Sequence, residues 1–281
     1  MHTDTDEFRP RVHFDGPDGR IVVGNSLTSF EKGSWSDDVV LGASFAGVPT
    51  GVLPVRQGAK GWIAHEGGPG KDEAGIGGLP VAERFGVPAA AIATMTARLG
   101  DGDSLLTGTV SRVNAVAADL GVKPGMTGEQ AAHVMLKAPR GRAHDVSGLV
   151  DERTLLIRST PQGSIYSCWS TSRVEGEHPD DVFCVASHGA KTMAAYAVRI
   201  NPKGLICNDA GMGLGDSGIE GLPMLEEHGI GAAAVSSDSA RIGDPASTLQ
   251  GTVSAVNRVA AERGVQVGMA AAQAADLLLG N

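Results

Sequence analysis

Short apolar runs alternate with stretches of helical periodicity along this chain. In the second half, residues 182–186, 204–207 and 230–235 are apolar runs that indicate buried strands. Residues 191–199 and 216–228, which lie between these runs, have the apolar spacing of helices. Strands that alternate with helices pair in parallel, because a parallel connection needs a crossover. The pattern therefore predicts an α/β fold with mostly parallel sheets.

Two strand-like runs around a proline turn precede this alternation in each half. The runs are residues 11–14 and 20–23 in the first half, and residues 154–157 and 164–167 in the second. The turns between them are Pro17-Asp-Gly19 and Pro161-Gln-Gly163. Proline sets the turn and glycine closes it, so we expect a β-hairpin at each place.

The last part of the chain has the signals of two helices. Ser247 and Gln250 have the spacing of a capping box, and apolar residues follow at helical intervals through residues 253–260. Gly264 is expected to end this long helix, and a final helix is expected after Gly268. By the same logic, we expect Asp216 to cap the helix over residues 216–228.

The sequence contains an internal repeat. From Asp38 to His133, nearly every residue has a counterpart 143 positions later without a gap, as Gly75-Ile-Gly-Gly-Leu-Pro80 and Gly218-Ile-Glu-Gly-Leu-Pro223 illustrate. We therefore predict a tandem duplication of a unit that consists of a β-hairpin followed by βαβαβα. The expected fold is a layered α/β sandwich whose sheets are related by a pseudo-twofold.

The duplication divides the chain into two expected domains. The first α/β repeat is assigned to residues 1–136, and the second to residues 151–281. Residues 137–150 are basic and contain glycine, and they are interpreted as a linker. At roughly 130 residues, each repeat is long enough to bury its own core.

Composition excludes several classes of partner. The 281 residues carry a formal charge of −9, whereas nucleic-acid binding needs a basic surface. Residues 270–279 are apolar but too few to span a membrane, and Met1–Glu7 has neither the basic region nor the apolar run of a secretory signal. The odd cysteine count and the absence of metal-type spacing favour a reducing compartment, here the cytoplasm. The cysteines are Cys168, Cys184 and Cys207. We also expect a homo-oligomer that acts on a small polar molecule.

Comparison of the two copies separates architecture from chemistry. Residues kept in both copies serve the shared fold, whereas a polar residue found in one copy is a candidate for function. Ligands of open parallel sheets bind beyond the carboxyl ends of the strands. Three such ends are polar in the second copy: Ser187-His-Gly189, Asn208-Asp-Ala-Gly211 and Ser236-Ser-Asp-Ser239. Their counterparts are Ser44-Phe-Ala46, His65-Glu-Gly-Gly68 and Ala93-Thr-Met-Thr96.

These strand ends suggest a catalytic hypothesis. His188 is interpreted as a general base that Asp209 orients, because a neighbouring carboxylate fixes the tautomer of an imidazole. Ser187 or a water molecule would be the nucleophile, and the N–H groups around Gly189 and Gly211 would face an oxyanion. The structural alternative is that His188 caps a helix or packs against a loop.

Further polar residues at the strand ends are candidates for substrate binding. They are Asn208, Ser236, Ser237, Asp238 and Arg241 of the second copy. Arg241 could clamp a substrate carboxylate, but Arg98 and Asp101 repeat Arg241 and Asp244, which favours an ion pair within a loop.

An acid persists at one strand end in both copies, because Asp209 aligns with Glu66. Such an acid can accept N–H bonds from the turn that follows, or it can bind a ligand. His65 and Glu66, if they met His188 and Asp209, would form a mixed nitrogen and oxygen site suited to a divalent transition metal.

The sequence supports three functional hypotheses. The first is a hydrolase acting on an amide, lactam or ester bond, with its site in the second repeat or at the cleft between repeats. No Gly-x-Ser-x-Gly elbow is present, so an α/β-hydrolase is not indicated. The others are a non-catalytic protein that binds a small metabolite and an accessory subunit of a larger enzyme.

Overall fold

The structure is a computed structural model that describes residues 9–280 and divides into two compact units. Unit 1 takes in the chain up to Gly67 and then Gly75–Val150. Unit 2 takes in the short segment Gly68–Ala74 and the chain from Asp151 onward. Met1–Glu7, which was examined for a secretory signal, lies outside the described residues.

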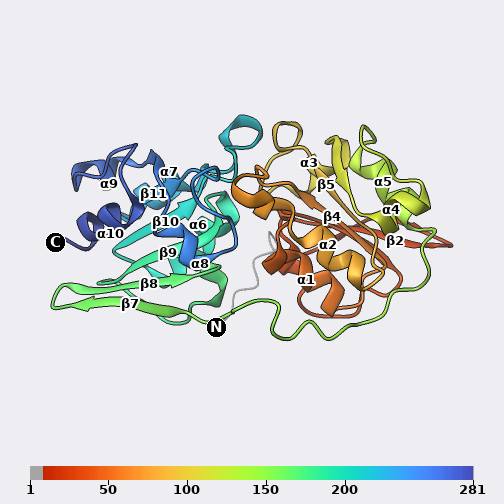
Figure 1. The fold of residues 1–281 in the computed structure, drawn as a ribbon, viewed down its shortest axis with the longest axis horizontal. Helices are drawn as coiled ribbons and strands as arrows, with labels where there is room; N and C mark the ends of the chain where they lie inside the picture. The colour runs from red at the N-terminus through yellow and green to blue at the C-terminus, as the bar shows by residue number, and fades with distance from the viewer. Residues whose placement is uncertain (1–8, 281) are drawn as a thin grey trace. The chain divides into compact units, whose positions relative to one another are not determined.

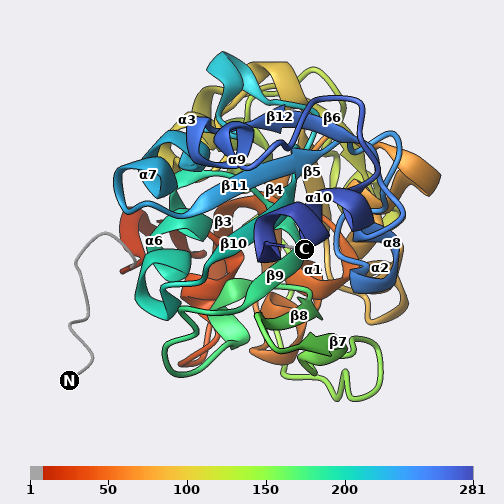
Figure 2. The same cartoon turned by 90° about the vertical axis from the view of Figure 1, so that its left-hand side faces the viewer.

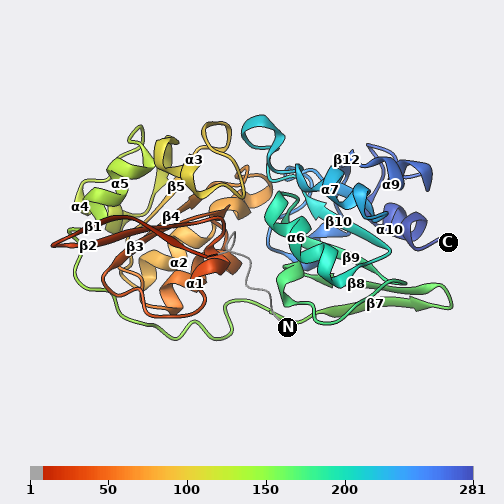
Figure 3. The same cartoon turned by 180° about the vertical axis from the view of Figure 1, so that it is seen from behind.

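A six-stranded mixed sheet forms the centre of unit 1, and its strands follow the order of the chain. The outer pairs β1–β2 and β5–β6 are antiparallel, while β2 through β5 are parallel. The strands are β1 (Arg11–Gly16), β2 (Gly19–Gly24), β3 (Asp38–Phe45), β4 (Gly61–His65), β5 (Ala89–Ile92) and β6 (Val110–Val113). The β1–β2 pair confirms the first predicted hairpin (Figure 3).

Helices cover both faces of the sheet in unit 1 (Figure 1). They are α1 (Val48–Arg56), α2 (Gly78–Arg84), α3 (Gly102–Thr107), α4 (Ala115–Leu120) and α5 (Gly128–Met135). Side chains alternate between the faces along each strand. Val39 and Leu41 of β3 therefore join the core under α3, α4 and α5, while Val40 joins the core under α1 and α2.

A second six-stranded mixed sheet forms the centre of unit 2, with the same strand order and the same pattern of parallel and antiparallel pairs. Its strands are β7 (Leu155–Thr160), β8 (Gly163–Cys168), β9 (Val182–His188), β10 (Gly204–Asn208), β11 (Gly231–Val235) and β12 (Val253–Val256). The predicted hairpin over residues 154–167 and the three predicted parallel strands are confirmed.

The helices of unit 2 also lie on both faces of its sheet. They are α6 (Lys191–Ile200), α7 (Gly221–Glu227), α8 (Pro245–Thr248), α9 (Arg258–Glu262) and α10 (Ala271–Leu279). Figure 2 shows α6 and α7 on one side of β9, β10 and β11, with α10 on the other. Phe183 and Val185 of β9 pack under α6 and α7, whereas Val182 and Cys184 pack under α10. Both units are thus α/β layers, as the sequence pattern predicts.

The prediction of one long helix from Ser247 through residues 253–260 is wrong. Asp244 caps the short helix α8, while the hydroxyl of Ser247 accepts the N–H of Arg241. Val253–Val256 is the edge strand β12, antiparallel to β11, and a new helix starts at Arg258. Valine spaced three residues apart fits a helix and a short strand equally, and here pairing with β11 decides between them.

Asp216 is not the helix cap that its position suggested. It has a left-handed backbone (φ 56°) at the end of a 3-10 turn (Leu214–Asp216), and α7 begins only at Gly221. The chain between them passes close to the end of β10. A side chain at Gly218 would place its Cβ 2.1 Å from the carbonyl oxygen of Asp209, so this approach needs glycine.

Asn114 and Asn257 are buried amides, and each caps the helix that follows it. Within the described part of the chain, no helix is long and apolar enough to cross a membrane.

Candidate functional site

Three parallel strands bring the predicted polar residues of unit 2 to one edge of its sheet. The strands β9, β10 and β11 end at His188, Asn208 and Val235, and their carboxyl ends lie side by side. The side chains there are buried, with relative exposures of 7% for Ser187, 3% for His188 and 4% for Asp209. The sheet therefore gathers the residues that the sequence singled out.

His188 makes a contact that belongs to the structural alternative. The N–H of Ala190, at the start of α6, donates to His188 Nδ1 over 3.3 Å. A nitrogen that accepts a hydrogen bond carries no proton, so the neutral ring holds its proton on Nε2. His188 Nδ1 is therefore occupied by the backbone and not by Asp209.

Asp209 is engaged with the backbone of the loops around it. Its Oδ1 accepts the N–H groups of Gly211 (3.0 Å) and Ser237 (2.9 Å). His188 pairs in register with Asn208, so these two side chains share a face of the sheet, and alternation directs the next residue, Asp209, to the other face. The predicted His188–Asp209 pair is not among the hydrogen bonds of Asp209.

The two N–H groups predicted to face an oxyanion already have acceptors. Gly189 donates to the carbonyl oxygen of Asn208 over 3.0 Å, and Gly211 donates to Asp209 Oδ1. Gly189 is required by close packing, because a Cβ there would lie 2.7 Å from Cys207 Sγ. These glycines therefore position the strand ends and leave no N–H for an oxyanion.

Asn208 and His65 perform the same task in the two units. Asn208 accepts the N–H of Ala210 (2.9 Å) through Oδ1 and donates to the carbonyl of Ala240 (3.1 Å). His65 accepts the N–H of Gly67 (2.9 Å) through Nδ1, and its Nε2 lies 3.2 Å from the carbonyl of Ala97. An amide and an imidazole thus each join a strand end to the loop after the next strand.

This role explains why His65 stays uncharged. Burial lowers the pKa of His65, although the carbonyls of Thr94 and Ala97 and the charge of Glu66 favour the protonated ring. Nδ1 must also keep its lone pair to accept the N–H of Gly67. Folded His65 therefore resists protonation.

Replacing His65 with asparagine is expected to reduce the loss of stability in acid. The unfolded chain protonates His65 near pH 6.5 and the folded chain only at lower pH, so the stability is fully present above pH 6.5 and falls as the pH drops toward the lowered pKa of the folded chain. The loss reaches about 1.4 kcal/mol per pH unit, or up to about 2 kcal/mol between pH 6.5 and pH 5. Asparagine keeps both hydrogen bonds and does not titrate.

Urea unfolding at pH 8 and pH 5 measures this difference. The His65→Asn variant should approach the wild type at pH 8 and lose less stability at pH 5. The exposed His228→Asn variant serves as the control, because within residues 9–280 the ring of His228 makes one hydrogen bond, to the carbonyl of Met224 at the end of α7. An equal acid loss in His65→Asn and the wild type would contradict the assignment.

The proposed metal site finds no support from these groups. Both ring nitrogens of His65 face the backbone, so neither is left to bind a metal. Across residues 9–280, no three side chains of histidine, cysteine, aspartate or glutamate gather in a way that could hold a metal ion.

The cysteines are buried thiols. Cys168, Cys184 and Cys207 are free and buried in the strands of unit 2. Burial raises the pKa of Cys168 to about 12 and raises that of Cys207 further. Cys207 is therefore a packing residue and not a nucleophile.

The acid at the strand end is used differently in the two units. Glu66 of unit 1 accepts from the hydroxyl of Thr94 through Oε1 and from the hydroxyl of Ser111 through Oε2. Asp209 is one methylene shorter, and the hydroxyl of Ser254, the counterpart of Ser111, instead donates to the carbonyl of Ala234. Among the described residues, Oδ2 of Asp209 has no hydrogen-bond partner.

Two serine hydroxyls at the same strand ends have the same property. Ser44 Oγ of unit 1 accepts the N–H of Leu27, but its counterpart Ser187 makes no side-chain hydrogen bond within residues 9–280. The hydroxyl of Ser237 likewise has no partner in the part of the chain that the structure describes, although its N–H binds Asp209. Unit 2 thus carries spare polar groups at positions that unit 1 uses.

A loop that the sequence assigned to the first repeat borders these groups. Lys71 of the segment Gly68–Ala74 donates its N–H to the carbonyl of Ser237 (2.9 Å). A Cβ at Gly70 would lie 2.6 Å from that same oxygen. The gapless alignment gave no signal of this placement, because a loop can leave its own unit without any change in sequence periodicity.

Left-handed backbone concentrates in this segment and its counterpart. Of the six non-glycine residues with positive φ among the described residues, four lie there and a fifth, Ala210, directly precedes the counterpart; the four are Asp72, Glu73, Met212 and Asp216. Such conformations cost of order 1 kcal/mol or more each and gather at functional sites. The sequence pattern did not reveal this strain, because only the glycines of these loops suggested it.

The remaining candidates lie at the surface of the same loops. Arg241 is near Asp244 (3.9 Å) and Asp72 (3.5 Å), so it forms the predicted loop ion pair and a second one. Ser236 Oγ accepts the N–H of Asp238, which is exposed. These contacts stabilise the loop that holds Ser237.

Comparison of the chain with protein-family models, with curated proteins and with solved structures finds no match in any of the three. The site must therefore be interpreted from its own geometry.

Proposed function

We propose that unit 2 binds a small polar molecule at the carboxyl ends of β9, β10 and β11. The observation that carries this proposal is the spare hydrogen-bonding capacity of three buried side chains, Ser187, Asp209 and Ser237. The free atoms, Ser187 Oγ, Asp209 Oδ2 and Ser237 Oγ, are open to solvent although their residues are mostly buried, so a ligand can reach them. A bound ligand or water would supply the missing partners.

The chemistry of these groups indicates the ligand. A carboxylate oxygen accepts hydrogen bonds, and a serine hydroxyl both donates and accepts. Asp238 adds negative charge to a neighbouring loop, whereas Asp72 is paired with Arg241. The site therefore favours a neutral or cationic molecule with N–H or O–H groups, such as an amide, lactam or amine, over an anion.

Hydrolysis of an amide, lactam or ester bond is the second candidate. A buried carboxylate with an unbonded oxygen can take a proton from water as that water attacks a carbonyl carbon. The proton would then pass to the departing nitrogen or oxygen as the bond to carbon breaks, and the hydroxyls of Ser187 and Ser237 would donate to the carbonyl oxygen. Gly189 and Gly211 have no role in this scheme, since their N–H groups are occupied. Cytoplasmic location, self-association and an accessory role remain predictions from the sequence.

The Asp209→Asn variant tests the binding proposal. Asparagine keeps an oxygen to accept the N–H groups of Gly211 and Ser237, so the fold should survive while the carboxylate is lost. We expect a panel of small amides, lactams and amines to raise the melting temperature of the wild type. Asp209→Asn should weaken the binding of any such compound about tenfold or more.

Glu66→Gln in unit 1 is the matched control, because Glu66 holds the equivalent position but has its hydrogen bonds within the unit. It should leave ligand binding unchanged. Equal binding by wild type and Asp209→Asn would contradict the site. Release of p-nitrophenol from its acetate or of p-nitroaniline from its acetamide, dependent on Asp209, would support the hydrolytic candidate.

A further inference from the structure

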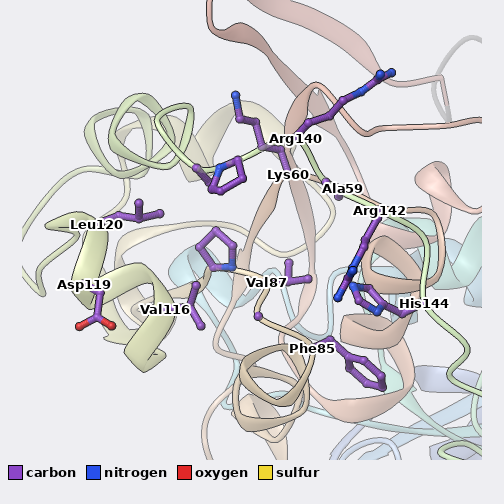
Figure 4. Close-up of a pocket in the computed structure, with 15 residues that line it drawn as sticks. Ala59, Lys60, Phe85, Val87, Val116, Asp119, Leu120, Arg140, Arg142 and His144 are labelled. Atoms are coloured by element: carbon purple, nitrogen blue, oxygen red, sulfur yellow. The ribbon is translucent and has the colours of Figure 1, made fainter.

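A pocket of about 540 Å³ lies entirely within unit 1, at the end of the sheet where β4 and β5 begin. This is the amino end of the parallel strands, opposite to the carboxyl ends considered above. Its floor is apolar and includes Phe85, Val87, Pro88 and Leu120. Polar side chains stand around this floor (Figure 4).

One wall of the pocket is the segment that the sequence assigned as a linker. Residues 138–142 and His144 line it, and the segment is fixed to unit 1 by the N–H of Gly141, which donates to the carbonyl of Ser36 (2.8 Å). A Cβ at Gly141 would lie 2.3 Å from the carbonyl oxygen of Gly58. The wall is therefore a defined part of unit 1.

The cations around the pocket differ in what they already bind. Lys60 donates to the carbonyl of Asp18 (2.6 Å), and Arg140 pairs with Asp37 (3.2 Å). Arg142 has no hydrogen-bond or ion-pair partner within residues 9–280. Its guanidinium lies beside the ring of His144, and Asp119 stands on the opposite side of the pocket (Figure 4).

His144 extends the apolar floor toward Arg142. Its ring centroid is 5.1 Å from that of Phe85, and burial together with the charge of Arg142 lowers the pKa of His144. His144 is therefore neutral at pH 7 and adds no charge of its own. The pocket thus combines the unpaired guanidinium of Arg142 with the tilted rings of His144 and Phe85 and with an aliphatic floor.

The second copy shows that this pocket is specific to unit 1. The counterpart of Leu120 is Arg263, whose Nη1 donates to the carbonyl of Lys203 (2.6 Å). A Cβ at Gly231, the counterpart of Pro88, would lie 3.2 Å from that nitrogen. The equivalent place in unit 2 is therefore occupied by the side chain of Arg263.

We propose that the unit 1 pocket binds a small organic anion, a carboxylate or a phosphate monoester with an apolar body, with Arg142 as the residue that binds the anionic group. The guanidinium presents paired N–H donors that match two oxygens of a carboxylate or phosphate. The floor formed by Phe85, Val87 and Leu120 contacts the apolar body. Pockets of 300–1,000 Å³ with an apolar lining and few polar groups are typical ligand sites.

Calorimetric titration with three probes tests the proposal. The probes are 2-naphthoate, 2-naphthyl phosphate and the uncharged 2-naphthalenemethanol. We expect at least one of the two anions to bind and the alcohol to bind at least tenfold more weakly, because it lacks the charge-assisted bonds to Arg142. The stronger of the two anions identifies the anionic group.

Two variants and a spectroscopic reading locate the site. Arg142→Gln should weaken anion binding about tenfold or more, whereas Arg112→Gln, an exposed arginine of β6 outside the pocket lining, should not. The ¹H NMR signal of the His144 ring, assigned with a His144→Gln variant, should shift on titration. Equal binding of the alcohol, an unchanged affinity in Arg142→Gln, or an unmoved His144 signal would each overturn the proposal.

Discussion

Replacing Asn257 with alanine is expected to lower the free energy of unfolding by about 4 kcal/mol or more. The side chain is 5% exposed and makes four hydrogen bonds to the backbone. Its Oδ1 accepts the N–H groups of Ala232 and Ala260, both over 2.9 Å. Its Nδ2 donates to the carbonyls of Ile230 (2.9 Å) and Leu222 (3.2 Å).

The size of the effect follows from what alanine leaves behind. Two N–H groups and two carbonyls lose their partner, and each unsatisfied buried group costs about 1–3 kcal/mol. Water that enters the cavity would recover part of this, so we take the lower end of the sum. A whole domain has a stability of about 5–15 kcal/mol, so unit 2 should be close to unfolding.

Urea unfolding followed by circular dichroism measures the loss. Asn114→Ala in unit 1 is the matched variant, because Asn114 bonds in the same way to Ala89, Ala117 and Val87. Asn257→Asp separates packing from hydrogen bonding, since its second carboxylate oxygen would face the carbonyl of Ile230 and repel it. This variant should regain stability in acid, when the protonated carboxyl can donate. A loss below about 1 kcal/mol in Asn257→Ala would show that the network does not support the fold.

The sequence predicted the elements whose signals are local. A proline turn specifies the β1–β2 hairpin, and uninterrupted apolar runs specify β9, β10 and β11. It failed where tertiary pairing decides. Val253 and Val256 fit helical spacing, yet they form an edge strand because β11 offers an unpaired edge there.

The sequence could place polar side chains at the strand ends, but it could not predict which hydrogen bonds each of them makes. The predicted parallel strands placed Ser187, Asp209 and Ser237 at adjacent strand ends, and the pairing of β9, β10 and β11 agrees with that placement. The sequence could not show that His188 and Asp209 contact different loops, because this depends on which face of the sheet each residue occupies. The sequence offered His65 as a metal ligand. Its alignment with Asn208 is better explained by a side chain that donates and accepts hydrogen bonds without carrying a charge.

Differences in side-chain size between the two copies also indicate where each unit has room for a ligand. The pocket of unit 1 lies where Leu120 stands in place of Arg263. The proposed site in unit 2 lies where an acid is one methylene shorter than its counterpart Glu66. In each case a small loss of side-chain volume in one copy leaves a space or a free polar atom that the other copy lacks.

Replacing Arg20 with methionine is expected to cost about 3 kcal/mol in the unfolding free energy of unit 1. Arg20 donates through Nε and Nη2 to the two oxygens of Asp38, over 2.7 Å and 2.8 Å. Asp38 is 1% exposed, so the variant would leave a buried carboxylate without its cation. The same hydrogen bonds raise the pKa of Arg20, which keeps it charged. Because the Arg20 side chain is 42% exposed, we take the lower end of the usual range for a broken buried pair.

The double variant Arg20→Met with Asp38→Leu distinguishes the cost of an unpaired charge from the worth of the pair. If the unpaired carboxylate dominates, removing it should recover much of the loss, because a buried ion pair and a matched apolar pair are often close in stability. Arg153→Met is the control, since its pair with Asp151 is exposed and should contribute little to stability. A double variant less stable than Arg20→Met would instead mean that Asp38 has a further role at the start of β3. Asp181, the counterpart of Asp38 in unit 2, illustrates such a role. Its carboxylate accepts the N–H of Ser164 and contacts the ring of His178, and within residues 9–280 it has no arginine partner.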